Sequence, residues 1–67
     1  MAATITYTVA GMTCDHCRMA VTKELTAVGG VETVAVDLDS KLVTVTGVNL
    51  DDTAMRAAID EAGYEAA

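Results

Sequence analysis

The sequence has no phenylalanine or tryptophan, and its 67 residues include only two tyrosines, two cysteines and one histidine. Half of the residues are hydrophobic, but most of these are small, chiefly alanine and valine. This composition favours a compact two-layer α+β sandwich over a disordered chain. A chain of this length forms one domain, residues 1–67, with a marginal core and no room for an enclosed active site. We therefore expect a protein that is not an enzyme.

Long apolar runs are also missing. No segment approaches the roughly 18 apolar residues of a membrane span, and residues 1–4 lack the basic and apolar regions of a signal peptide. We therefore expect a cytoplasmic protein without direct membrane insertion, in a compartment that keeps thiols reduced. Four Lys and Arg residues against ten Asp and Glu give a net charge of −6. This charge disfavours nucleic acid and anionic membranes as partners and favours a neutral or basic docking face.

Both cysteines and the only histidine lie in one stretch, residues 11–17, which reads Gly-Met-Thr-Cys-Asp-His-Cys. Polar and apolar residues alternate before it, at 4–9, as in a half-buried strand. Apolar residues recur at helical spacing after it, at 21–28. The stretch therefore lies at a strand-loop-helix junction, where Cys14 in the loop and Cys17 at the helix start can turn their sulfurs toward one point. Unpaired N–H groups and the helix dipole favour thiolates there.

The remaining patterns predict the order β-α-β-β-α-β. The expected strands are 4–9, 31–38, 42–46 and a short last strand at 64–66, and the expected helices run from Asp15 or His16 to Ala27 and from the N-cap Asp51 to Gly63. This order is typical of an α+β sandwich in which two helices cover one face of a four-stranded antiparallel sheet. We expect Asp15 or the hydroxyl of Thr13 to cap the first helix.

A lone C-x-x-C motif is a weak signal, and four interpretations compete. Structural zinc takes four ligands, whereas this chain offers Cys14, Cys17 and a histidine, His16, that lies between them. Thioredoxin-like exchange needs a longer β-α-β opening. An inert, buried pair of cysteines is not expected beside Gly, Asp and His, which are typical of exposed loops. Two-coordinate binding of Cu(I) fits best, because this soft ion prefers thiolates and tolerates low coordination numbers.

The same residues resemble the heavy-metal-associated domain family. Residues 11–17 look like its G-M-x-C-x-x-C motif, and the resemblance continues through Gly-Gly-Val at 29–31, Val-Ala-Val-Asp-Leu at 34–38 and Gly-Tyr at 63–64. It covers nearly the whole chain and is most similar to free-standing bacterial copper chaperones of the CopZ type. The resemblance implies a ferredoxin-like βαββαβ fold.

By resemblance, Cys14 and Cys17 are the ligands of Cu(I), which the protein hands by ligand exchange to a copper-transporting P-type ATPase. Thr13 precedes the first cysteine where relatives that carry zinc, cadmium or lead often have an acidic residue, and this favours Cu(I). Mercury-binding relatives share Met-Thr-Cys. A Zn(II), Cd(II) or Hg(II) carrier, an excised ATPase metal-binding domain and a thiol-disulfide redox protein remain alternatives.

Three further residues are accessory candidates. The family packs the residue equivalent to Met12 beneath the loop, and Met is chiefly an adaptable gap-filler, so we expect Met12 in the core rather than on copper. Tyr64 matches a tyrosine beside the metal site of bacterial members, where it shields the ion, approaches a sulfur or simply fills space. His16 is either a solvated helix residue or one that tunes the site. The open site also predicts a copper-bridged homodimer.

Overall fold

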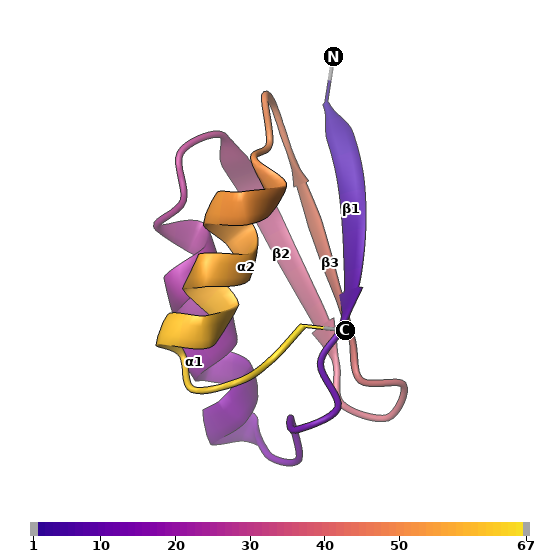
Figure 1. Ribbon diagram of the computed structural model, residues 1–67. Helices are drawn as coiled ribbons and strands as arrows, with labels where there is room; N and C mark the ends of the chain where they lie inside the picture. Colours follow the sequence, from indigo (N-terminus) through magenta and orange to yellow (C-terminus); the bar gives the residue numbers. More distant parts are fainter. Residues whose placement is uncertain (1, 67) are drawn as a thin grey trace.

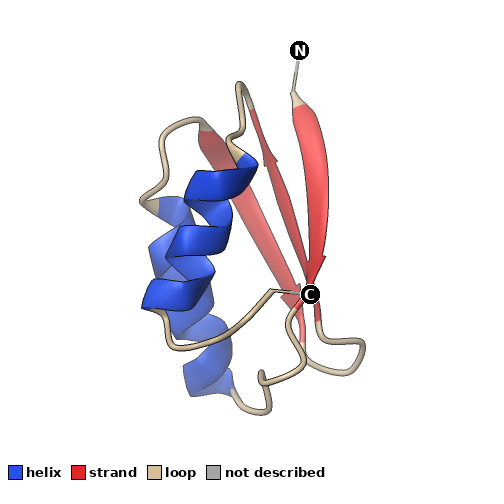
Figure 2. Cartoon of the chain, in the orientation of Figure 1, coloured by secondary structure: helices blue, strands red, loops and turns tan. Residues whose placement is uncertain are grey.

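The computed structural model describes residues 2–66, and its elements follow the order predicted up to the second helix. They are β1 (Ala3–Thr8), α1 (Asp15–Thr26), β2 (Val31–Asp37), β3 (Leu42–Gly47) and α2 (Asp52–Glu61). The strands form one antiparallel sheet in the order β1-β3-β2, and both helices lie against the same face of it (Figures 1 and 2). The expected α+β sandwich is confirmed.

The core lies between the sheet and the two helices, as the alternating patterns predict. In the sheet register, Val43 of β3 stands between Tyr7 of β1 and Val36 of β2. The fully or almost fully buried side chains are Tyr7, Val9, Met12, Val21, Leu25, Val43, Val45, Met55, Ala58 and Ile59. Threonines alternate with these positions on β1 and β3 and turn to the other face. Within residues 2–66, neither helix is long and apolar enough to cross a bilayer.

The predicted fourth strand at 64–66 is wrong, because these residues form no strand and the sheet has three. After α2 the chain turns at Gly63 and crosses toward the end of β1 (Figure 1). Arg56 of α2 holds this segment, donating from Nη1 to the carbonyl of Ala66 at 3.3 Å. The described residues after the turn form no ladder of hydrogen bonds along β1.

Three connecting segments meet at one end of the molecule. They are residues 9–14 between β1 and α1, which we call the cysteine loop, the β2–β3 turn at 38–41, and the segment at 63–66 that follows α2 (Figure 1). The N–H of Val9 donates to the carbonyl of Lys41 at 2.8 Å, which joins the first two. A methyl group placed at Gly11 would lie 3.2 Å from Cδ1 of Tyr64, so the third segment packs on the first.

Candidate metal centre

The cysteine loop is anchored at its start and opens at its end. Val9 and Met12 are fully buried, and the N–H of Met12 donates to the carbonyl of Val9 at 3.3 Å, closing a turn between them. The chain then emerges, and Cys14 takes the N-cap position of α1 with an extended backbone (φ −149°, ψ 171°). Its carbonyl accepts the first helical hydrogen bond, from the N–H of Arg18 at 3.1 Å. This anchoring brings the first cysteine to the surface at a helix N-terminus.

The predicted capping of α1 by Thr13 or Asp15 is wrong. The N-cap residue is Cys14, and no side chain caps the helix by a hydrogen bond. Asp15 lies one position too late, in the first turn, where its carboxylate pairs with Arg18 at 3.4 Å. The first N–H groups of α1 therefore lack a side-chain acceptor, and this favours negative charge on sulfurs nearby.

The two sulfurs converge, as the spacing of the motif predicts. The Sγ atoms of Cys14 and Cys17 are 3.3 Å apart, and both residues are free thiols. Cys14 is exposed, whereas Cys17, in the first turn of α1, is half-buried and packs against the core. Within residues 2–66, no group of three or more His, Cys, Asp and Glu side chains is gathered to hold a metal ion. The site is therefore a pair of sulfurs with one side open to solvent.

The surroundings of Cys17 favour its thiolate. A backbone hydrogen bond at Thr13, the hydroxyl of Tyr64 and the thiol of Cys14, in that order of effect, lower the pKa of Cys17 to about 6. The same interaction raises the pKa of Tyr64, because a thiolate beside a phenol opposes its ionisation. At neutral pH, Cys17 is therefore mostly a thiolate, which is the form that binds metal ions.

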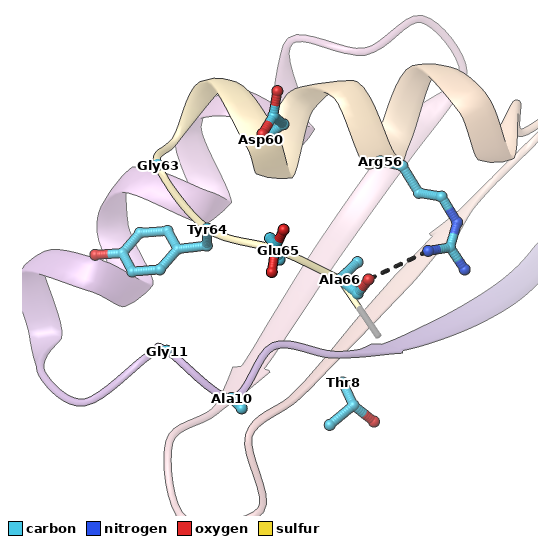
Figure 3. A pocket seen from close by; sticks show the side chains of 9 residues that line it. All are labelled: Thr8, Ala10, Gly11, Arg56, Asp60, Gly63, Tyr64, Glu65 and Ala66. Atoms are coloured by element: carbon cyan, nitrogen blue, oxygen red, sulfur yellow. Dashed lines mark hydrogen bonds between the residues drawn. The ribbon is translucent and has the colours of Figure 1, made fainter.

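Tyr64 is placed beside the site by the end of α2. Gly63 adopts a left-handed conformation (φ +94°), and its N–H donates to the carbonyl of Asp60 at 2.9 Å. The N–H of Tyr64 donates to the carbonyl of Ile59 at 3.1 Å. This pair of bonds is the Schellman motif, which fixes the direction in which the chain leaves a helix. The ring of Tyr64 then extends over Gly11 toward the start of α1 (Figure 3).

The other two accessory candidates lie in different environments. Met12 is fully buried beneath the loop, in contact with the core, where the packing interpretation places it. His16 is exposed in the first turn of α1, between the two cysteines in the chain. The structure thus brings Cys14, Cys17 and Tyr64 together, leaves His16 at the rim and places Met12 inside.

An open groove of about 740 Å³ runs between β1 and the segment after α2, next to the site. Figure 3 shows it, with Arg56 at one end and Tyr64 at the other. It is lined by Thr8, Ala10, Gly11, Arg56, Asp60, Gly63, Tyr64, Glu65 and Ala66.

Sequence reasoning missed the polar contacts that two residues, Lys41 and Tyr7, make with partners far away in the chain. Nζ of Lys41 donates to the carbonyl of Met12 at 2.6 Å, from a residue 29 positions away. The hydroxyl of Tyr7 donates to Asp52 at 2.6 Å, and Arg56 donates to the same carboxylate at 3.1 Å. A lysine in a turn and a tyrosine in a strand give no signal of such partners, which only the fold brings together.

The lowered pKa of Cys17 predicts that this thiol titrates early in the metal-free protein. In Cys14→Ser, where Cys17 is the only thiol, we expect thiolate absorbance in the ultraviolet to appear well below the ordinary cysteine pKa of 9.0. Adding Tyr64→Phe removes one lowering interaction, so the pKa should rise while staying below 9.0, because the bond at Thr13 remains. Since the folded-state pKa is depressed, the thiolate stabilises the fold above the unfolded pKa and this stabilisation is lost as the pH falls through about 6. Identical titrations with and without the Tyr64 hydroxyl would show that it does not act on the sulfur.

An α+β sandwich that presents two converging thiols on a surface loop is typical of small domains that handle soft metal ions or exchange thiols. Residues 6–65 match the heavy-metal-associated domain family, and the chain belongs to that family. Its sheet shows three strands of the ferredoxin-like arrangement.

The relatives are small metal-handling proteins of similar length. The copper chaperone CopZ of Staphylococcus haemolyticus is 41% identical over 61 residues, which cover 85% of this chain and 87% of that protein. A solved CopZ metallochaperone superposes with a TM-score of 0.92 at 30% identity, covering 97% of this chain and all of the other. The copper chaperone Atx1 from Synechocystis PCC6803, in its Cu2 form, superposes with a TM-score of 0.81 at 40% identity, covering 94% and 98% of the two chains.

Proposed function

We propose that this protein is a cytoplasmic Cu(I) chaperone without catalytic activity. It binds Cu(I) through Cys14 and Cys17 and hands the ion by ligand exchange to a copper-transporting P-type ATPase. The observation that carries the proposal is the open pair of free sulfurs, 3.3 Å apart on the surface of a heavy-metal-associated domain. The named copper chaperones among its relatives support copper as the cargo.

The chemistry of the pair suits a soft ion that must be released again. A metal-thiolate bond is about 2.3 Å long, so two sulfurs in line with one ion lie up to about 4.6 Å apart. The present separation of 3.3 Å opens by rotation of the exposed Cys14, while Cys17 stays packed. Cys14 is thus the side from which an acceptor thiolate enters. The new copper–sulfur bond forms before the bond to Cys14 breaks, and the copper stays Cu(I) throughout.

The alternatives fit this geometry less well. A closed zinc site lacks third and fourth ligands within residues 2–66. A thiol-disulfide exchange protein needs one sulfur that is both exposed and of low pKa. Here the thiol whose pKa is lowered, that of Cys17, is half-buried. We therefore place metal transfer ahead of a redox role, of a Zn(II), Cd(II) or Hg(II) carrier and of an excised ATPase domain.

Docking and self-association follow from charge and from the open coordination. The net charge of −6 suits an acceptor domain with a neutral or basic face. A second copy of the chain can also supply the third sulfur, which gives a copper-bridged homodimer. Tyr64 and His16, at the rim of the pair, would line that contact.

Transfer by direct ligand exchange predicts a rate that depends on the acceptor. The copper-loaded protein is mixed with an acceptor domain that carries two cysteines. We expect copper to reach the acceptor at a rate proportional to the acceptor concentration. Separating the two proteins by charge and measuring copper in each, under anaerobic conditions, gives this rate. A rate independent of the acceptor would mean that copper first dissociates into solution, and efficient turnover in an insulin-reduction assay would instead support the redox alternative.

A further inference from the structure

Lys41 adopts a backbone conformation that few residues with a side chain adopt. It closes the β2–β3 turn with φ +63°, in the left-handed region. The preceding turn is held by the carboxylate of Asp37, which accepts from the N–H groups of Asp39 at 2.9 Å and Ser40 at 3.3 Å. Gly or Asn is the usual residue at such a position, because a longer side chain is strained there. The presence of lysine therefore needs a reason other than the turn.

That reason lies in the cysteine loop, which Lys41 contacts twice. Its carbonyl accepts from the N–H of Val9 at 2.8 Å, and its Nζ donates to the carbonyl of Met12 at 2.6 Å. Val9 and Met12 are the two residues joined by the turn that opens the loop. The left-handed conformation allows main chain and side chain of one residue to hold both ends of this turn.

The ammonium group of Lys41 differs from the two arginines in having no carboxylate partner within residues 2–66. Arg18 pairs with Asp15, and Arg56 pairs with Asp52, each on its own helix. Within residues 2–66, the partner of the Lys41 ammonium is a backbone carbonyl and not a carboxylate. The contact is part-buried, where a hydrogen bond from a charged donor is stronger than at an exposed site.

We propose that Lys41 is a positioning residue of the metal site, whose ammonium fixes the carbonyl of Met12 and so holds the cysteine loop ready to present both sulfurs. The inference rests on the proposed function, because the residue acts on metal only through the loop. Met12 lies two residues before Cys14 in the chain, so an anchored Met12 restricts the position of the first sulfur. A loop released at Met12 must be reordered each time a metal ion binds, which lowers affinity.

The test separates the ammonium from the turn. Lys41→Asn accepts the left-handed backbone but cannot reach Met12, whereas Lys41→Arg keeps a charged donor of similar length. Lys23→Gln is the matched control, because it removes the same charge from an exposed position in the last turn of α1. Amide hydrogen exchange of residues 12–17 in the metal-free protein reports on the loop, the thermal midpoint reports on the fold, and competition with a chromogenic Cu(I) chelator reports on affinity.

In Lys41→Asn we expect about tenfold faster exchange in the loop and about tenfold weaker Cu(I) binding. The thermal midpoint should fall by only a few degrees, because Asn also relieves the strain of the left-handed backbone. Lys41→Arg should restore loop exchange and affinity to within about threefold of the wild type, and Lys23→Gln should change neither. The inference would be overturned if Lys41→Asn had the same loop exchange and Cu(I) affinity as Lys23→Gln. It would also be overturned if exchange in Lys41→Asn became faster in the core by the same factor as in the loop. The two failures can be told apart, because loop exchange is measured without copper. A wild-type protein that failed to bind Cu(I) would refute the proposed function, whereas the exchange data would still test the role of Lys41 in the loop.

Discussion

Replacing Cys14 and Cys17 together with serine should abolish tight Cu(I) binding and leave the fold intact. A hydroxyl is a hard, neutral ligand that Cu(I) does not select, and within residues 9–17 this pair carries the only sulfurs that are not fully buried. Changing residues that merely support a metal ligand costs about 10- to 100-fold in affinity, so removing both ligands should cost more than ~100-fold. The core is built by other residues, so the free energy of unfolding should change by less than about 1 kcal/mol.

The measurement is anaerobic competition with a chromogenic Cu(I) chelator, together with thermal unfolding followed by circular dichroism. Thr13→Ser in the same loop is the matched control, because Thr13 acts on Cys17 through its backbone. It should bind Cu(I) like the wild type. A double cysteine variant that kept wild-type affinity would contradict the assignment of both ligands.

Met12→Ala should cost about 2–5 kcal/mol of stability, because Met12 is fully buried and its removal leaves a cavity under the loop. A domain of this size has a total stability of only about 3–10 kcal/mol, so a substantial fraction of the variant should be unfolded. Met12→Leu keeps the volume and should cost less than about 1.5 kcal/mol. It should also keep one Cu(I) per chain, because the sulfur of Met12 packs in the core and does not face the ion.

Urea unfolding of the three proteins measures the cost, and copper analysis after gel filtration measures the stoichiometry. Met19→Ala is the control, since Met19 is 57% exposed on α1 and its truncation should change stability by less than about 0.5 kcal/mol. If Met12→Leu folded normally but lost copper, Met12 would be a ligand and the packing interpretation would be wrong.

Local patterns were sufficient to predict most of the fold. Alternation in the three strands places Tyr7, Val43 and Val45 in the core, where the structure has them. Asp51 caps α2 as predicted, its carboxylate accepting from the N–H of Thr53 at 3.0 Å. These features depend on neighbours a few residues away, so the sequence carries them directly. The convergence of the two sulfurs is predictable for the same reason, because it follows from a three-residue spacing at a helix start.

Apart from the cap of α1, the features that were missed depend on contacts between distant segments. The prediction of a fourth strand failed because the segment after Gly63 is held in another way. Arg56 bonds the carbonyl of Ala66 and the ring of Tyr64 packs on Gly11, and these partners become neighbours only in the folded chain. The position of Tyr7 in the core was predicted, but its hydrogen bond to Asp52 was not, because the two residues are 45 positions apart in the chain. Burial and this bond raise the pKa of Tyr7 to about 12. Lys41 reads as an ordinary turn residue until the cysteine loop lies beside it.

One measurement tests the central claim most directly, namely that this pair of sulfurs is a carrier site for Cu(I). The metal-free, reduced protein is titrated anaerobically with Cu(I) and Zn(II) in competition and examined by mass spectrometry under native conditions. We expect one Cu(I) per chain, displacement of zinc by copper, and copper-bridged dimers beside the monomer. Preferential loading with zinc, or no retained copper at one equivalent, would contradict the claim.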